Sequence, residues 1–151
     1  STRFRGKIDR LDELNDGTIL ILDYKTGTVD FSPNHIRTGN HFQALLYLLA
    51  TEQVYPQPVS GMLFYDLKRG ELRRGLLAKD RVSKEAVKSV TRGHAVEPEL
   101  WEEIKSAGLE HLKEYAAKIQ TGKFPAIPDA SSCSMCDYPS HCREAHGYLN
   151  G

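Results

Sequence analysis

The sequence predicts an α/β fold, in which helices flank a mixed central β-sheet of about four strands. Its apolar segments follow one another in the order strand, strand, helix, strand, strand, helices, which is typical of one mixed sheet. The segment TILIL, residues 18–22, is apolar on both faces of a strand, and this favours a central strand that is covered on both sides. A chain of 151 residues with 40% hydrophobic side chains is long enough to bury the core of one domain.

Local sequence patterns predict where each element lies. In chain order we expect strands over 3–14 and 18–25, a loop over 26–39, a helix over 41–53, strands over 59–67 and 71–78, a short helix over 83–91, a long helix over 98–121 and a loop from 123 onwards. The first two strands are joined by Asn15, Asp16 and Gly17, which are typical hairpin-turn residues. In the long helix, the residues expected to face the core are Leu100, Ile104, Leu112, Tyr115 and Ile119.

The first hairpin carries charged residues where a buried strand would carry Val or Leu. If its turn is a three-residue loop, Leu14 pairs with Thr18, and the same register places Asp9 opposite Asp23. Facing side chains on two strands lie about 5 Å apart, so two ionised carboxylates at these positions repel each other. A bound cation removes the repulsion, and hard oxygen ligands at this separation suit Mg²⁺ or Mn²⁺.

Lys25 lies two residues past Asp23 and therefore points to the same face of the strand. A lysine beside a metal-bound carboxylate can orient or deprotonate an attacking water, or stabilise developing charge, which are the tasks of phosphodiester hydrolysis. The alternative is a pair of ordinary ion pairs at a sheet edge, Asp9 with Arg10 or Lys7 and Asp23 with Lys25. The apolar character of residues 18–22 favours the end of a central strand, where ligand sites are common.

Three motifs together resemble the RecB-like branch of the PD-(D/E)xK nuclease superfamily, which includes the RecB and AddB helicase-nucleases and the CRISPR-associated RecB-like exonucleases. The family pattern G-x-[IV]-D-R-[IVL]-D matches residues 6–12, D-[YF]-K-[ST]-G matches residues 23–27, and Q-x-x-x-Y matches residues 43–47. The resemblance covers nearly the whole chain. It implies a restriction-endonuclease-like core over residues 1–130 and a metal-dependent DNA exonuclease, a deoxyribonuclease acting in DNA repair or recombination.

The resemblance also implies roles for single residues. Asp9 and Asp23 would hold Mg²⁺ or Mn²⁺, with the backbone carbonyl of Tyr24 as a third ligand, and Lys25 would be the catalytic lysine. The family usually carries a further His or Glu on a helix before the first strand, and we expect that helix to be missing from this chain.

The helix motif contributes two further candidate catalytic residues. The resemblance implies that Gln43 and Tyr47 line the site and contact the DNA strand or position Lys25. Without the resemblance, a solvated helix residue and a core aromatic would be the simpler interpretations of Gln43 and Tyr47.

All three cysteines lie close together, at Cys133, Cys136 and Cys142. Their spacing is typical of metal or cluster ligands. In iron–sulfur members of the resembling family, a similar stretch holds a 4Fe–4S cluster together with an upstream cysteine, which would lie outside this chain. Residues 131–151 would then be a cysteine-rich staple of the same domain. The alternative is a zinc site completed by His141 or His146.

Composition limits the compartment and the partners. The chain has 20 basic and 20 acidic residues, which disfavours a purely electrostatic DNA binder but leaves local basic faces possible within 66–75 and 79–88. No apolar run approaches the ~20 residues that span a bilayer, so we expect no membrane association. Clustered cysteines in odd number argue against a secreted disulfide framework and favour the cytoplasm.

Two other functions stay open at this point, a non-catalytic DNA-binding or structural nuclease-like module and a zinc-bearing interaction domain. The chain has no phosphate-loop motif, so any DNA unwinding would require a separate helicase domain or subunit. We expect DNA as the main partner and the chain to be a module of a larger protein, and we do not expect an isolated fragment to be active.

Overall fold

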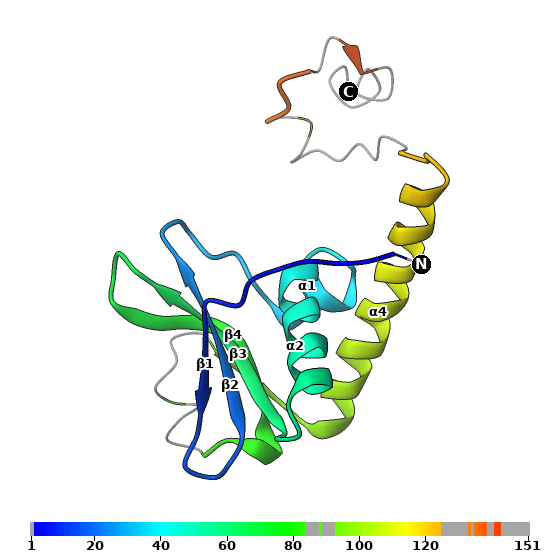
Figure 1. Ribbon diagram of the computed structural model, residues 1–151. Coiled ribbons are helices and arrows are strands. Elements are labelled where there is room, and N and C mark those ends of the chain that lie inside the picture. Colours follow the sequence, from blue (N-terminus) through cyan, green and yellow to red (C-terminus); the bar gives the residue numbers. More distant parts are fainter. Residues whose placement is uncertain are drawn as a thin grey trace. The chain divides into compact units, whose positions relative to one another are not determined.

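The computed structural model describes residues 2–83, 88, 93–124, 133, 135–138 and 141–142 (Figure 1). The chain divides into two compact units, residues 1–114 and residues 115–151. The first unit holds the whole sheet and two helices, and the long helix α4, Pro98–Gln120, begins in the first unit and ends in the second. No helix in the described ranges has the length and apolar character needed to cross a membrane.

The sheet of the first unit is mixed, which confirms the predicted fold class. Its strands lie in the order β1-β2-β3-β4-β5, and their bounds are Arg10–Glu13, Ile19–Lys25, Val59–Asp66, Glu71–Ala78 and Gly93–Val96. Strand β2 runs antiparallel to β1 and parallel to β3, while β4 runs antiparallel to β3 and parallel to β5. The prediction of about four strands missed β5, which has only 4 residues. The short helix expected over 83–91 lies mostly outside the described residues.

The turn between β1 and β2 has the predicted three-residue loop. The Leu14 amide donates to the Thr18 carbonyl at 2.8 Å, and Gly17 adopts a φ of 78°, a conformation that favours glycine. Asp16 Oδ1 accepts hydrogen bonds from the Thr18 hydroxyl and amide, and these bonds lower the pKa of the Asp16 carboxyl. The register continues with Arg10 opposite Leu22, as the loop length requires.

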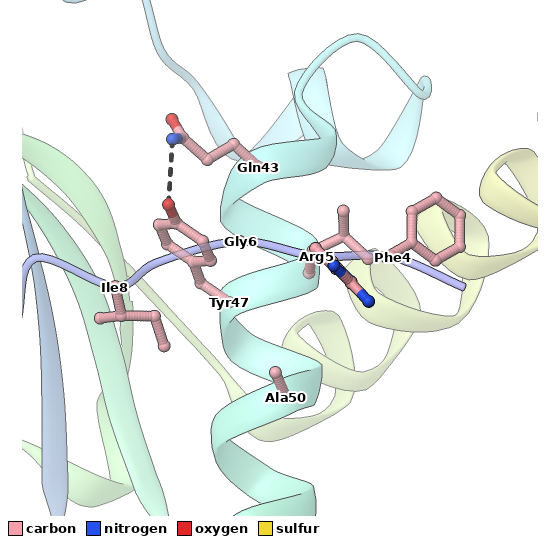
Figure 2. Close-up of a pocket in the computed structure, with 8 residues that line it drawn as sticks. Phe4, Arg5, Gly6, Ile8, Gln43, Tyr47 and Ala50 are labelled. Carbon is pink, nitrogen blue, oxygen red and sulfur yellow. Dashed lines mark hydrogen bonds between the residues drawn. The ribbon is translucent and has the colours of Figure 1, made fainter.

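The predicted first strand is too long, because residues before β1 contact helix α2, Phe42–Val54, instead of pairing with β2. Figures 1 and 2 show this N-terminal segment running across α2. The Tyr47 hydroxyl donates to the Lys7 carbonyl oxygen at 2.6 Å, and Ile8 packs against the core. Only Arg10–Glu13 forms a strand.

The helices begin where local chemistry favours a helix start. Helix α1, Pro33–Arg37, has proline in its first turn, and it lies within 26–39, where the sequence predicts only a loop. Helix α2 agrees with its prediction, and the ring Nδ1 of His41 caps its first turn by accepting from the Ala44 amide at 3.4 Å.

The face that α4 buries differs in part from the prediction. Its buried residues are Trp101, Ile104, Gly108 and Leu112. Leu100 is 38% exposed and Ile119 is 58% exposed, so neither belongs to the buried core. The predicted face is therefore out of phase at Leu100, next to the aromatic side chain that is buried.

The main core lies between one face of the sheet and the three helices (Figure 1). It includes Ile21 of β2 and Phe64 of β3, both fully buried. A smaller cluster of Leu22, Leu63 and Leu77 packs on the opposite face. Strand β2 is therefore an interior strand with apolar contacts on both faces, as predicted, and its alternation places Asp23 on the same face as Ile21.

Candidate functional site

Asp23 and Lys25 lie at the carboxyl end of β2, on the helix-covered face of the sheet. Asp23 pairs in register with Phe64 of β3 and is only 3% exposed. The ammonium nitrogen of Lys25 lies 2.7 Å from Asp23 Oδ2 and 5.7 Å from the centre of the Phe64 ring. Among the described residues Asp23 Oδ2 has no partner with hydrogen-bond angles, so this buried oxygen has only the ion pair with Lys25.

Asp9 reaches the same end of β2 from the residue just before β1. Its Oδ2 accepts a hydrogen bond from the Tyr24 amide at 3.0 Å. Arg10 pairs instead with Asp12, at 2.6 Å, and this contact raises the pKa of the Arg10 guanidinium. The alternative ion pair between Asp9 and Arg10 is therefore wrong, whereas the one between Asp23 and Lys25 is present.

Helix α2 connects Lys25 to the N-terminal segment through a chain of hydrogen bonds. Gln43 Oε1 accepts from Lys25 Nζ at 2.9 Å, and Gln43 Nε2 donates to the Tyr47 hydroxyl at 3.3 Å (Figure 2). The two α2 side chains are one turn apart and so lie on one face. Tyr47 in turn donates to the Lys7 carbonyl, two residues before Asp9. The chain of contacts brings together all five residues that the sequence singles out as catalytic.

His41 also lies close to this network, although the sequence predicts only a surface or core role for it. Its ring packs against Phe31 and Phe64, with centroids 5.1 Å and 5.5 Å away. Burial lowers the pKa of His41, and the positive charges of Lys25 and His35 lower it further. The position of His41 two residues before Gln43 was the signal that could have placed it here.

Open space adjoins the site along α2. A cavity of about 550 Å³ is lined by Phe4, Arg5, Gly6, Ile8, Gln43, Leu46, Tyr47 and Ala50 (Figure 2). A second cavity, of about 460 Å³, includes Asp9 in its lining. A polymeric substrate therefore has room on the side of the site where α2 faces the N-terminal segment.

The oxygen donors at the strand end fit a hard divalent cation. Asp9 and Asp23 are carboxylates, and the Tyr24 carbonyl belongs to the same end of β2. Mg²⁺ is commonly held by one or two carboxylates and keeps several of its waters, so this small set suffices chemically. Across the described ranges no three His, Cys, Asp or Glu side chains are arranged to hold a metal ion.

The three cysteines are free thiols. The Cys136 amide donates to the Cys133 carbonyl at 3.4 Å, and Cys136 Sγ accepts from the Tyr138 amide at 3.3 Å. Their described positions form no metal-holding group, and His146, one of the two alternative zinc ligands, lies outside the described residues.

Comparison with known proteins assigns this site to a family. The family described as the PD-(D/E)XK nuclease superfamily matches residues 1–143. The chain belongs to the PD-(D/E)XK nuclease superfamily. Members of this superfamily typically use divalent metals such as Mg²⁺.

Similar proteins place the chain in the RecB-like branch of this superfamily. It is 23% identical over 185 residues to the exonuclease/helicase subunit RexB of Lactococcus lactis subsp. cremoris (strain MG1363), covering 97% of this chain and 17% of that protein. It is 28% identical over 190 residues to an ATP-dependent helicase/deoxyribonuclease subunit of Carboxydothermus hydrogenoformans, covering 91% and 17%. The gene 69 protein of Mycobacterium phage L5 is 29% identical over 142 residues, covering 93% and 39%.

The chain spans between 17% and 39% of the length of these relatives. No solved structure matches it significantly.

Proposed function

We propose that this chain is the nuclease module of a DNA-processing protein, a Mg²⁺- or Mn²⁺-dependent DNA exonuclease that acts in repair or recombination. One observation carries the proposal. Two aspartates from the two arms of the hairpin lie at the end of β2, Asp9 on the Tyr24 amide and Asp23 2.7 Å from the Lys25 ammonium. Membership of the nuclease superfamily supports the chemistry.

The proposed metal ligands are Asp9, Asp23 and the backbone carbonyl of Tyr24. Asp23 is suited to this role because its buried Oδ2 has no hydrogen bond from a described residue and would gain from a cation. When bound, the metal would supply a water of lowered pKa and neutralise charge on the phosphate.

Lys25 is proposed to act on the phosphate rather than on the metal. Its ammonium is one-third exposed and is held between Asp23 and Gln43. A cation at this position can stabilise the negative charge that develops on a phosphate oxygen, or hold the attacking water by a hydrogen bond. The Gln43 side chain fixes where the ammonium lies, and Tyr47 fixes Gln43.

Partners and location are part of the proposal. The similar helicase/nuclease subunits support DNA as substrate and a helicase domain or subunit as partner. A DNA substrate and a cluster of three free thiols are consistent with a cytoplasmic location.

For the cysteines we propose a structural 4Fe–4S cluster in the native protein, held by Cys133, Cys136, Cys142 and a further cysteine. The hydrogen bond from the Tyr138 amide to Cys136 Sγ supports it, because such bonds commonly accompany thiolate ligands. Metal analysis of anaerobically purified protein tests this. Four irons per chain are expected, whereas one zinc without iron would favour the zinc-bearing alternative.

A second candidate function is a nuclease-like module without catalysis. It is favoured by one observation, that no third acidic or histidine side chain joins Asp9 and Asp23 among the described residues.

Cleavage assays on the native protein that carries this sequence separate the two functions. Asp23→Asn and Lys25→Ala are expected to lower Mg²⁺-dependent degradation of linear DNA by at least about 100-fold, while binding of DNA and the melting temperature change little. A closed circular DNA should resist the wild-type protein if it is an exonuclease. Equal degradation by wild type and both variants would rule out the proposed site.

A further inference from the structure

A second polar cavity lies just beyond Lys25, at the carboxyl ends of the parallel strands β2 and β3. It has a volume of about 270 Å³ and is lined by Thr26, Gly27, Thr28, Asp66, Lys68 and Arg69. The Leu67 amide donates to the Lys25 carbonyl at 2.9 Å, which holds the segment after β2 beside the β3–β4 turn. Crevices at this edge of a sheet commonly bind ligands.

The carboxylate in this cavity is already satisfied by the β3–β4 turn. Asp66 is 5% exposed, and its Oδ1 accepts from the Lys68 and Arg69 amides at 3.0 Å and 3.2 Å. Its Oδ2 lies 3.4 Å from the Arg69 guanidinium. The lining side chains therefore carry two positive charges and one negative charge, a net charge of +1.

Several donors in the lining stay available for a ligand. The Lys68 ammonium has no ion pair or hydrogen bond with a described residue, and the same holds for the hydroxyls of Thr26 and Thr28. The Arg69 side chain is 57% exposed. A side chain at Gly27 would meet nothing within 4 Å, so the backbone there is open to an approaching group. Ammonium, guanidinium and hydroxyl donors around a small cavity are the groups that bind phosphate.

We infer that this cavity is a phosphate-binding subsite, which holds a backbone phosphate of the DNA strand next to the phosphate that is cleaved. The inference rests on the proposed function. Gly27 is two residues past Lys25, and two residues of extended chain span about 7 Å. A strand that presents its scissile phosphate to Lys25 can therefore reach the cavity with a neighbouring phosphate. The basic segment 66–75, to which the sequence alone assigns no role, contributes the two cations of this lining.

Binding in EDTA tests the subsite without any cleavage. Fluorescence anisotropy would measure the Kd of a short labelled single-stranded oligonucleotide for the 151-residue chain over a series of salt concentrations. Lys68→Gln is expected to raise the Kd roughly 3- to 10-fold and to reduce the slope of log Kd against log salt by about 0.7, because one phosphate contact is lost. Lys113→Gln, on α4 and outside the lining, is the matched control and should change neither.

A pair of substitutions at Gly27 tests the cavity itself. Both side chains have room, since a Cβ there is free of contacts. Gly27→Glu introduces a negative charge and is expected to weaken oligonucleotide binding several-fold more than the neutral Gly27→Gln of the same size.

Three results would overturn the subsite. They are an unchanged Kd and salt slope in Lys68→Gln, equal losses in Lys68→Gln and Lys113→Gln, and equal binding by the two Gly27 variants. If Lys68→Gln weakens binding of a deoxynucleoside 5′-monophosphate but not of the oligonucleotide, the cavity holds the released product and the strand subsite is wrong. None of these results affects the cleavage test, so the nuclease function can stand while the subsite fails.

Discussion

The Tyr47 hydroxyl donates a 2.6 Å hydrogen bond to the main-chain oxygen of Lys7, and this bond fastens the N-terminal segment to helix α2. Asp9 follows two residues later and reaches the Tyr24 amide. Because residues before Arg10 have no strand partner, the helix replaces a sheet in holding this aspartate near Asp23.

Removing that hydroxyl should loosen Asp9. Tyr47→Phe loses one hydrogen bond, and we expect the free energy of unfolding to fall by about 1 kcal/mol and the catalytic rate to fall as Asp9 becomes less ordered. Urea denaturation and DNA cleavage measure the two effects. Tyr65→Phe is the matched control, since no hydrogen bond of the Tyr65 hydroxyl is found among the described residues, and a loss of the same size there would contradict the assignment.

Gln43 is expected to position the lysine rather than to bind the metal. Gln43→Leu removes the 2.9 Å hydrogen bond to Lys25 and the bond to Tyr47, so we expect kcat to fall about tenfold with little change in KM. Gln53→Leu, near the exposed end of the same helix, should have normal kinetics. An unchanged kcat in Gln43→Leu would mean that Lys25 needs no support from α2.

Stability should decrease below about pH 6.5 because of His41. Burial gives the folded state a lower pKa than the ordinary 6.5, so the unfolded state binds the proton more readily. This contribution is fully present above pH 6.5 and is lost as the pH falls towards the lower folded value. Nearby Lys25 and His35 act in the same direction, and Asp23 opposes them.

Urea denaturation near pH 7.5 and near pH 5.5 checks this dependence. His41→Asn keeps a helix-capping side chain without a titrating ring, so its free energy of unfolding should change less between the two conditions. Asp16 has a lowered pKa and therefore loses its contribution only below pH 3.8, outside this range. The same loss in wild type and variant would show that another group is responsible.

Gly108 should resist even the smallest side chain. A Cβ there would lie 2.9 Å from Ile36 Cγ2 and 3.0 Å from the Ile36 carbonyl oxygen, so α1 and α4 touch at this point. Replacing a helical glycine by alanine usually stabilises a helix slightly, but we expect Gly108→Ala to lower the free energy of unfolding by about 1–3 kcal/mol. Gly27→Ala, with nothing within 4 Å, should be neutral in the same urea experiment.

The hairpin could be predicted because its information is local. Asn15, Asp16 and Gly17 define a three-residue loop, and that loop alone places Asp9 in register with Asp23. The start of β1 could not be predicted, because it depends on the contact between Tyr47 and Lys7, which are distant in sequence. Helix α1 escapes prediction because its five residues carry too little periodicity to stand out from a loop.

The candidate site divides in the same way. Asp23 and Lys25 share a face through strand alternation, which a sequence shows directly. The contact of Gln43 with Lys25 is expected only from the family motif, because nothing in the spacing of an exposed glutamine predicts its partner. The cavity around Lys68 has no motif at all, since a turn after β3 and a loop after β2 form it together.

Binding of Mn²⁺ to the metal-free chain tests the proposed metal site most directly, because it needs neither DNA nor catalysis. Electron paramagnetic resonance would count the bound ions and give their affinity for wild type, Asp9→Asn and Asp23→Asn. We predict one site in the wild type and at least a roughly tenfold weaker affinity in each variant, with the fold retained by circular dichroism. Affinity in Asp23→Asn equal to that of the wild type, or no Mn²⁺ binding by the wild type, would contradict a metal site at the end of β2.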